Sequence, residues 1–132
     1  MQPLSVFDIA ARAMSAQLVR LNTTASNLAN AGAVAGSEAT AYRALKPVFA
    51  SVYDHGLATV AVERIASDTR APERRHEPHH PLADADGNVW VAAVDTNQEL
   101  VEMTETARQY ANNVEVMATA KTLILDTLRL GR

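Results

Sequence analysis

The sequence predicts an α+β protein in which long N- and C-terminal helices pair as a coiled coil, with a small central β-hairpin domain between them in the chain. Apolar residues recur every three or four positions at both ends of the 132-residue chain, which is the spacing of a coiled-coil seam. The middle carries short β-branched runs instead. All five prolines and all five glycines lie outside the two apolar stripes. The stripes are therefore free to be helical along their whole length.

The N-terminal helix is expected at about residues 6–30. Ser5, with Asp8 three residues later, fits a first-turn cap just ahead of the apolar pattern. The stripe that would face a partner helix consists of Phe7, Ala11, Met14, Leu18, Leu21, Ala25 and Leu28. The small, polar and glycine-bearing residues 31–41 follow it and are expected to form a loop or hinge.

The end of this first helix combines poor helix formers with an unbroken apolar spacing. Because serine, threonine and asparagine favour non-helical backbone, we expect the segment to become helical only when its apolar face is buried against a partner. A helix with a polar back face is the alternative. The polar residues concerned are Asn22, Thr23, Thr24, Ser26, Asn27 and Asn30.

The middle of the chain, residues 42–95, changes from helical to strand-like patterns. Residues 58–65 alternate apolar and polar side chains, and residues 89–94 are a short β-branched run, so both are predicted to be strands. Asp86-Gly87-Asn88 supplies a turn directly before the second strand. Residues 68–83 contain three prolines and mixed charges, and we expect them to form a surface loop.

The C-terminal helix is expected at about residues 97–130. Thr96 and Glu99 have the spacing of a capping box at its start. Its seam is expected to consist of Leu100, Met103, Ala107, Tyr110, Val114, Met117, Lys121, Ile124 and Leu128. A second apolar line with heptad spacing lies on another face, which one partner helix cannot cover, so we assign it to a contact between subunits; it consists of Val116, Leu123 and Leu130.

These elements divide the chain into an N-terminal helix and hinge (1–41), a β-rich outer domain (42–95) and a C-terminal helix (96–132). A chain with two ends built to pack against other helices is expected to be a component of an assembly rather than an enzyme. We find no nucleophile elbow, phosphate-binding loop or dinucleotide fingerprint, and we predict neither a catalytic residue nor a cofactor.

Composition excludes several functional classes. The net charge of −3 argues against nucleic-acid binding, because nucleic-acid-binding domains usually carry a basic surface. The chain has no cysteine, which excludes disulfides, thiol catalysis and zinc–thiolate sites. No run of 18 apolar residues would span a membrane, and the N-terminus lacks the pattern of a Sec-type signal, so export would require another route.

Two polar segments resemble metal sites. His76, His79 and His80, with Glu77 beside them, are residue types that bind transition metals, but the prolines of this segment disfavour helical ligand geometry. A solvated loop is therefore the favoured interpretation. Asp84 and the residues that follow it resemble the start of a calcium loop, but position 12 is Asp95 rather than the bidentate acid that closes one, and position 6 is Val89 rather than the required glycine, so a turn is predicted and no metal site.

Three groups of residues resemble bacterial flagellar axial proteins. Residues 26–31 (SNLANA) are similar to the signature near the N-terminus of rod, hook and hook-associated proteins. Tyr42-Arg43 and Lys46-Pro47-Val48-Phe49, together with residues 80–89, resemble the C-type proximal rod subunits of that family. The C-terminal residues Tyr110, Asn113-Val114-Glu115-Val116, Thr119-Ala120-Lys121 and Leu128 to Gly131 match the same subunits. The resemblance covers essentially the whole chain.

This resemblance implies a structural subunit of the flagellar proximal rod, which self-assembles with other axial proteins and transmits motor torque through the basal body. It implies other rod subunits, basal-body proteins, copies of itself and the type III export apparatus as partners, with no nucleic acid and no membrane insertion. The rod lies in the periplasm, and export would proceed without a cleaved signal peptide. The expected assembly interface consists of Phe7, Met14, Leu18, Leu21, Asn27, Leu28, Asn30, Tyr110, Asn113, Val114, Met117, Leu123, Ile124, Leu128 and Leu130.

Two hypotheses from other classes remain at this point. A dimeric coiled-coil adaptor would use the same stripes but would be fully helical. A metal-binding domain would centre on the three histidines of residues 76–80.

Overall fold

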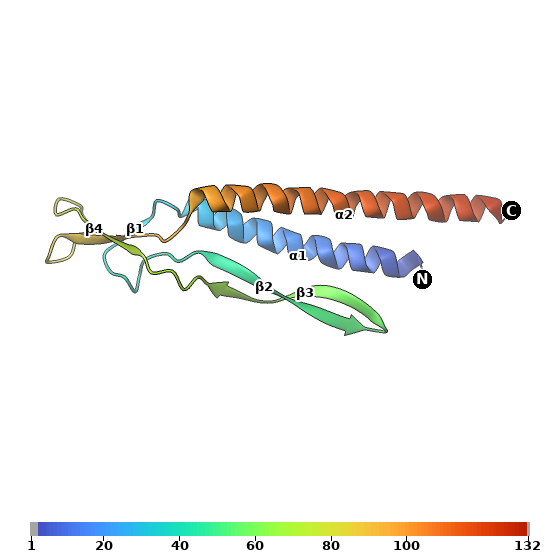
Figure 1. The fold of residues 1–132 in the computed structure, drawn as a ribbon, viewed down its shortest axis with the longest axis horizontal. Helices are drawn as coiled ribbons and strands as arrows, with labels where there is room; N and C mark the ends of the chain where they lie inside the picture. The colour runs from blue at the N-terminus through green and yellow to red at the C-terminus, as the bar shows by residue number, and fades with distance from the viewer. Residues whose placement is uncertain (1–2, 132) are drawn as a thin grey trace. The chain divides into compact units, whose positions relative to one another are not determined.

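A computed structural model describes residues 3–131 and confirms the α+β class, with two long terminal helices and small sheets between them (Figure 1). In chain order the elements are α1 (Pro3–Ala29), β1 (Val34–Ala35), β2 (Leu45–Asp54), β3 (Leu57–Ser67), β4 (Glu73–His76), β5 (Asn88–Val91) and α2 (Thr96–Leu130). No helix in this described part is long and apolar enough to cross a membrane.

The residues form two compact units, and each long helix contributes to both. The first unit draws on Met1–Leu21, Pro47–Arg64 and Thr104–Arg132, and the second on Asn22–Lys46 and Ile65–Met103. The predicted division into three consecutive segments remains a proposal about the assembled protein.

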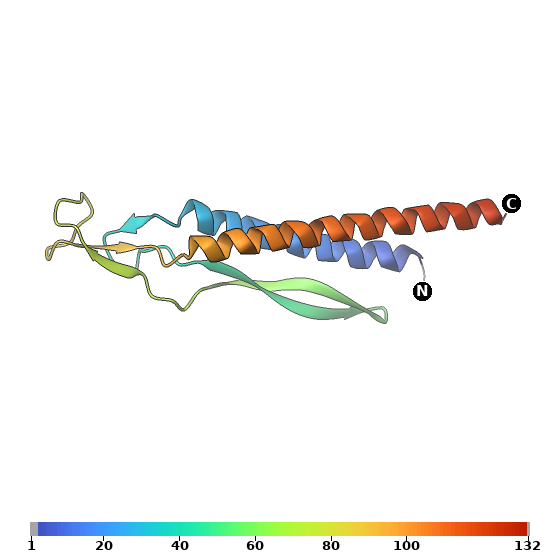
Figure 2. The same ribbon diagram turned by 45° about the horizontal axis from the view of Figure 1, so that its top comes forward.

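The first unit has three layers, with α1 between α2 and the β2–β3 hairpin (Figures 1 and 2). On one side, Arg12 of α1 forms an ion pair of 3.0 Å with Asp54 and donates a hydrogen bond of 3.2 Å to Thr59 of the hairpin. On the other side, Gln17 donates a hydrogen bond of 2.8 Å to Gln109 of α2. Positions 12 and 17 are about 140° apart around a helix, so α1 uses separate faces for its two neighbours.

The second unit contains a three-stranded antiparallel sheet in the order β1-β5-β4. The central strand β5 pairs Val91 with Val34 of β1 and Trp90 with Arg74 of β4. Val89 is fully buried, and so are Val91, the last residue of the strand, and the two alanines that follow it, Ala92 and Ala93. The short β-branched run predicted at 89–94 therefore forms part of a hydrophobic core, although its regular strand ends at Val91.

Both helices lie close to their predicted positions, but their N-terminal caps differ from the predicted ones. Helix α1 begins at Pro3, a position suited to proline because the first turn needs no amide donor, so Ser5 lies inside the helix and the predicted Ser5 cap is wrong. Helix α2 is capped by Asp95, whose Oδ1 accepts hydrogen bonds of 3.1 Å from the backbone nitrogens of Asn97 and Gln98. The predicted capping box is therefore wrong, because the cap is Asp95 and not Thr96. The Glu99 carboxylate instead accepts a hydrogen bond from Asn27.

The strand at 58–65 is confirmed within β3, but its partner was not predicted. That partner is β2, which contains Pro47; proline is tolerated there because both strands of a two-stranded sheet are edge strands. Strands β1 and β4 lie in the segments 31–41 and 68–83, which were expected to be loops. Both are too short to show a periodic pattern, and pairing with β5 makes them strands.

Candidate assembly interface

The covered face of α2 is a heptad line that the sequence predicted only in part. Its buried or half-buried residues are Glu99, Met103, Thr106, Tyr110, Asn113, Met117, Ala120 and Ile124. Four of the predicted seam residues, Met103, Tyr110, Met117 and Ile124, belong to this line. The residues expected to alternate with them are exposed and lie one position away; they are Leu100, Ala107, Val114, Lys121 and Leu128. The covered residues that alternate with these four are Glu99, Thr106, Asn113 and Ala120. Three of them are polar, so a search for apolar residues did not find them.

On α1 the most buried side chains are small or polar, namely Ala10, Ala16, Thr23, Thr24 and Asn27. Of the stripe predicted from the sequence, Phe7, Met14, Leu21 and Leu28 are half-buried. The other members, Ala11, Leu18 and Ala25, are exposed, with Leu18 at 44%. Small residues suit a helix held between two neighbours because they let the backbones approach closely.

Asn27 joins three segments of the second unit through its side-chain amide. The residue is 1% exposed. Its Nδ2 donates hydrogen bonds to the Leu45 backbone oxygen at 2.9 Å and to Glu99 Oε2 at 3.1 Å. Its Oδ1 accepts from the Leu45 backbone nitrogen and from the Tyr42 hydroxyl, both at 2.8 Å. All four hydrogen-bonding positions of the amide are thus used within one chain, and the residue holds α1, α2 and the start of β2 together.

The neighbours of Asn27 in the same motif end the helix. Asn30 Nδ2 donates a hydrogen bond of 2.8 Å to the Ser26 backbone oxygen, which also accepts from the Asn30 backbone nitrogen at 3.1 Å. The Ser26 hydroxyl lies 3.3 Å from the hydroxyl of Tyr42. The polar residues that weaken this segment as an isolated helix therefore make tertiary hydrogen bonds and satisfy terminal carbonyl groups.

A second polar cluster joins α1 to α2 in the first unit. Gln109 accepts from Gln17 and, at 3.4 Å, from Arg20, and its Nε2 donates to Glu105 at 3.0 Å. Glu105 also accepts two hydrogen bonds of 2.9 Å from Arg108 Nη2. The hydrogen bonds from Arg108, followed by that from Gln109, lower the pKa of Glu105, and the same carboxylate raises the pKa of Arg108. The cluster favours one register of the helix pair because a shift would separate these groups.

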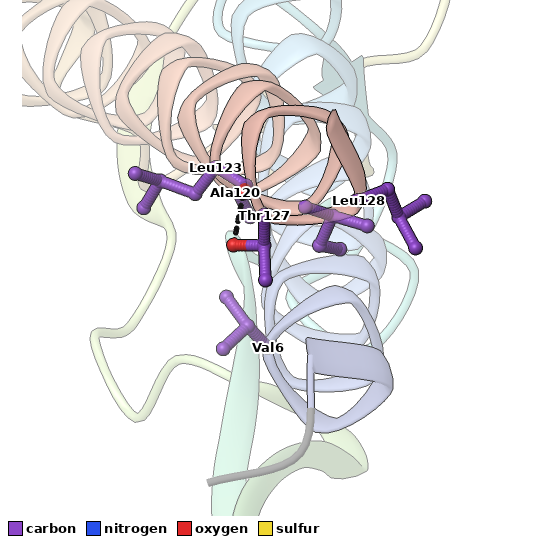
Figure 3. Close-up of a pocket in the computed structure, with 6 residues that line it drawn as sticks. Val6, Ala120, Leu123, Thr127 and Leu128 are labelled. Atoms are coloured by element: carbon purple, nitrogen blue, oxygen red, sulfur yellow. Dashed lines mark hydrogen bonds between the residues drawn. The ribbon is translucent and has the colours of Figure 1, made fainter. Parts of the chain in front are cut away.

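An open apolar groove lies between the start of α1 and the last turns of α2 (Figure 3). It has a volume of about 320 Å³. Thr127 points toward Val6 across the groove, with Leu123 and Leu128 to either side (Figure 3). The Thr127 hydroxyl donates a hydrogen bond of 2.7 Å to the Leu123 backbone oxygen, so it presents its methyl group to the groove. The residues that line the groove are Val6, Ala120, Leu123, Ile124, Thr127 and Leu128.

The surface around this groove is unusually apolar for a helix end. Leu123 and Leu128 are each 63% exposed and Leu130 is 88% exposed. Leu125 and Val116 are also more than a third exposed. Scattered exposed apolar residues are ordinary, but a cluster of leucines beside an apolar groove is typical of a protein contact surface.

The expected interface residues fall into three groups in one subunit. Asn27 is interior. The half-buried residues line internal contacts and remain partly accessible; they are Phe7, Met14, Leu21, Leu28, Asn30, Tyr110, Asn113, Met117 and Ile124. The exposed residues are available to another molecule; they are Leu18, Val114, Leu123, Leu128 and Leu130. Sequence reasoning missed Val6 of the groove, which lies outside the predicted stripe, and the partners of Asn27. Tyr42 and Leu45 lie in no periodic segment, and Glu99 is polar and so does not stand out in an apolar pattern.

The two segments considered as metal sites form a turn and an exposed edge. Asp84 Oδ1 accepts hydrogen bonds from the backbone nitrogens of Asp86 at 2.9 Å and Asn88 at 2.8 Å, which is a turn. His76 Nδ1 lies 3.3 Å from Asn88 Oδ1, and His80 Nδ1 accepts from the Leu82 backbone nitrogen. Among residues 3–131 the structure brings together no group of three potential metal ligands.

Both ends of the chain match known protein families. Residues 85–130 match the family described as flagellar basal body rod FlgEFG protein C-terminal. Residues 7–36 match the family described as flagella basal body rod protein. These ranges contain α2 and most of α1, including the Asn27 and Glu99 side chains that meet in the interior.

Full-length relatives agree with these matches. The chain is 45% identical over 132 residues to the flagellar basal-body rod protein FlgC of Salmonella typhimurium, covering 98% of each chain. It is also 45% identical over 135 residues to FlgC of Yersinia enterocolitica, covering all of both chains. FlgC of Buchnera aphidicola from Schizaphis graminum is 33% identical, with 99% of each chain covered.

Proposed function

This chain belongs to the FlgC family of flagellar basal-body rod proteins and is a structural rod subunit, not an enzyme, and we propose that it occupies the proximal rod and transmits motor torque there. In this role it contacts other rod subunits, basal-body proteins and copies of itself. It reaches the periplasmic rod through the flagellar type III export apparatus. The resemblance of residues 42–49 and 80–89 to C-type proximal rod subunits supports the proximal position.

The exposed leucines at the end of α2 are the observation that best supports assembly through this surface. Leu123, Leu128 and Leu130 are exposed in one subunit beside an apolar groove, although the covered face of α2 lies elsewhere. Burying a leucine side chain contributes about 1.5–3 kcal/mol. Contact with neighbouring subunits would remove these residues from water, and a rigid helix end is suited to carry torsional load between subunits.

A substitution on this surface tests the assignment. Leu123→Asp would place a carboxylate without a partner in an apolar contact, at a cost of several kcal/mol per subunit in the assembled rod only. We expect the variant to be exported normally and rod growth to stop at this subunit. The measurements are basal-body length by electron microscopy and the amount of the chain in the culture medium.

The matched control is Ala118→Asp, which adds the same charge at an exposed position about 140° around the helix from Leu123. Complete rods that contain the Leu123→Asp chain would show that this face is not an assembly interface. A wild-type chain that cannot be found in purified basal bodies would contradict the rod assignment altogether.

A further inference from the structure

The β2–β3 hairpin has a second apolar face that α1 does not cover. Asp54 and Thr59 both contact Arg12, so their side chains point toward α1. Side chains alternate between the two faces of a strand, so neighbouring positions in each strand point the other way. We call these residues the outer hairpin face; they are Phe49, Tyr53, Ala58, Val60 and Val62.

Most of the outer hairpin face is open to solvent: Phe49, Tyr53 and Ala58 are exposed, and Val60 and Val62 are half-buried. Tyr53 is 80% exposed and Phe49 is 38% exposed. A two-stranded hairpin is marginally stable unless its apolar faces are covered, and an exposed apolar patch on a sheet is typical of a contact surface. A sheet with two apolar faces is commonly covered by helices on both. Helix α1 covers the inner face, and a second helix would suit the outer face.

Within residues 3–131 the helices are α1 and α2, so a helix on the outer hairpin face would come from another molecule. Within the first unit, α2 contacts α1 through Gln109, on the side away from the hairpin contacts of Arg12. The last turns of α2 run past the start of α1 in both ribbon views (Figures 1 and 2), and they carry the exposed residues Leu128 and Leu130. The same chain thus has two exposed apolar surfaces that could fit each other, the last turns of α2 and the outer hairpin face.

We propose that the outer hairpin face of one subunit receives the leucine-bearing last turns of α2 from a neighbouring copy. This inference rests on the proposed rod function and names the surface that the α2 end would meet. The contact joins two different patches, so it is heterologous, and its repetition produces an open series of subunits rather than a closed pair. A hairpin-to-hairpin contact would instead close a dimer, which could not continue along a rod.

Single cysteines can test this contact because the wild-type chain has none. Cells that lack the native chain would express two variants together, Tyr53→Cys and a differently tagged Leu130→Cys. Basal bodies would be purified, oxidised and run on a non-reducing gel. We expect a mixed dimer as the dominant cross-linked species, because a disulfide cannot form between two variants unless the residues lie close in neighbouring copies.

In parallel experiments Leu123→Cys or Leu128→Cys would replace Leu130→Cys. The result then does not depend on which of the three leucines lies nearest to Tyr53 of the neighbouring copy. Ala118→Cys serves as the control, since position 118 is exposed, lies about 140° and 120° around α2 from Leu123 and Leu130, and is ten residues, or about 15 Å, before Leu128. Tyr53–Tyr53 dimers as the main product, or complete rods without a mixed dimer at any of the three leucine positions, would overturn the inference while leaving the rod function in place. Absence of the wild-type chain from basal bodies would overturn both.

Discussion

Asn27 and Glu99 are 72 residues apart in the sequence and are joined by a hydrogen bond of 3.1 Å from the amide Nδ2 to the carboxylate Oε2. Both side chains are buried. The bond connects the last turns of α1 to the first turn of α2, and the same amide binds the backbone of Leu45. One residue therefore fixes where three segments meet.

Replacement of Asn27 by alanine should destabilise the protein strongly. Asn27→Ala would leave polar groups of the half-buried Leu45 and Tyr42 and of the buried Glu99 without their partner, and each buried group of this kind typically costs about 1–3 kcal/mol. We expect a loss of at least about 3 kcal/mol in the free energy of unfolding. Urea titration followed by circular dichroism measures this loss.

The control for this prediction is Asn22→Ala, at an exposed position of the same helix, which should change the unfolding free energy by less than about 0.5 kcal/mol. Asn30→Ala removes a side-chain bond to one backbone carbonyl and should have an intermediate effect. Equal stabilities for Asn27→Ala and Asn22→Ala would show that the buried amide does not hold the segments together.

Asp68 should make stability depend on pH in the acid range. A hydrogen bond from the backbone nitrogen of Arg70 lowers the pKa of Asp68 below its ordinary value of 3.8, and Lys46, at 3.2 Å, lowers it further. The carboxyl of a folded chain with a lowered pKa contributes stability above its unfolded pKa and loses it as the pH falls through the folded pKa. Asp68→Asn should therefore reduce stability at neutral pH by about 1 kcal/mol, and this difference should shrink as the pH falls through the folded pKa of Asp68.

Unfolding free energies of both proteins at several pH values would test this prediction. Glu63→Gln is a suitable comparison because Glu63 is exposed and its ion pair with Arg64, at 3.5 Å, involves two exposed side chains. A constant difference between wild type and Asp68→Asn from neutral to acid pH would mean that the charge of Asp68 does not contribute.

Gly87 should not tolerate a side chain. Its φ of 76° lies in the left-handed region, and a Cβ there would stand 3.0 Å from Pro78 Cβ and 3.1 Å from His76 Cε1. Gly87→Ala is expected to cost about 1–3 kcal/mol, because it combines backbone strain with a clash next to β5. Fluorescence of Trp90, the only tryptophan and a residue of β5, would report the unfolding of this region.

Alanine substitutions at two other glycines separate the effect of backbone strain from that of the steric clash. Gly56 has a φ of 82°, but a Cβ at this position would meet open space, so Gly56→Ala should show strain alone. Gly32 has neither a positive φ nor a close neighbour, and Gly32→Ala should be neutral or slightly stabilising. A Gly87→Ala protein as stable as Gly32→Ala would contradict the geometry of the turn.

Lys121 should matter in the rod and not in the single subunit. The sequence placed it on the helix seam, but its side chain is exposed. Lys121→Leu is therefore expected to leave the unfolding free energy of the isolated chain within about 0.5 kcal/mol of wild type. If the lysine sets register between subunits, the variant forms irregular rods, which electron microscopy would detect. Regular rods with normal motility would exclude that role.

The sequence by itself determined the two long helices, the strand at 58–65 and the turn before β5, because each depends on local periodicity or on the backbone freedom of one glycine. It also determined the family, through motifs at Asn27 and along α2. The partners of β5 could not be predicted, because β1 and β4 are too short to carry a pattern and become strands only by pairing.

Only the tertiary structure decided which helix faces are covered. A stripe of apolar residues shows that a face prefers to be buried, but it does not show whether the partner lies in the same chain or in another. Thr106 and Glu99 lie on the covered face of α2 although they are polar, while Leu128 is exposed although it is apolar. Hydrogen bonds from residues distant in the sequence make the buried polar positions favourable, as Asn27 does for Glu99. Among residues 3–131 the structure leaves Leu123, Leu128 and Leu130 exposed, and we assign them to contacts with neighbouring subunits.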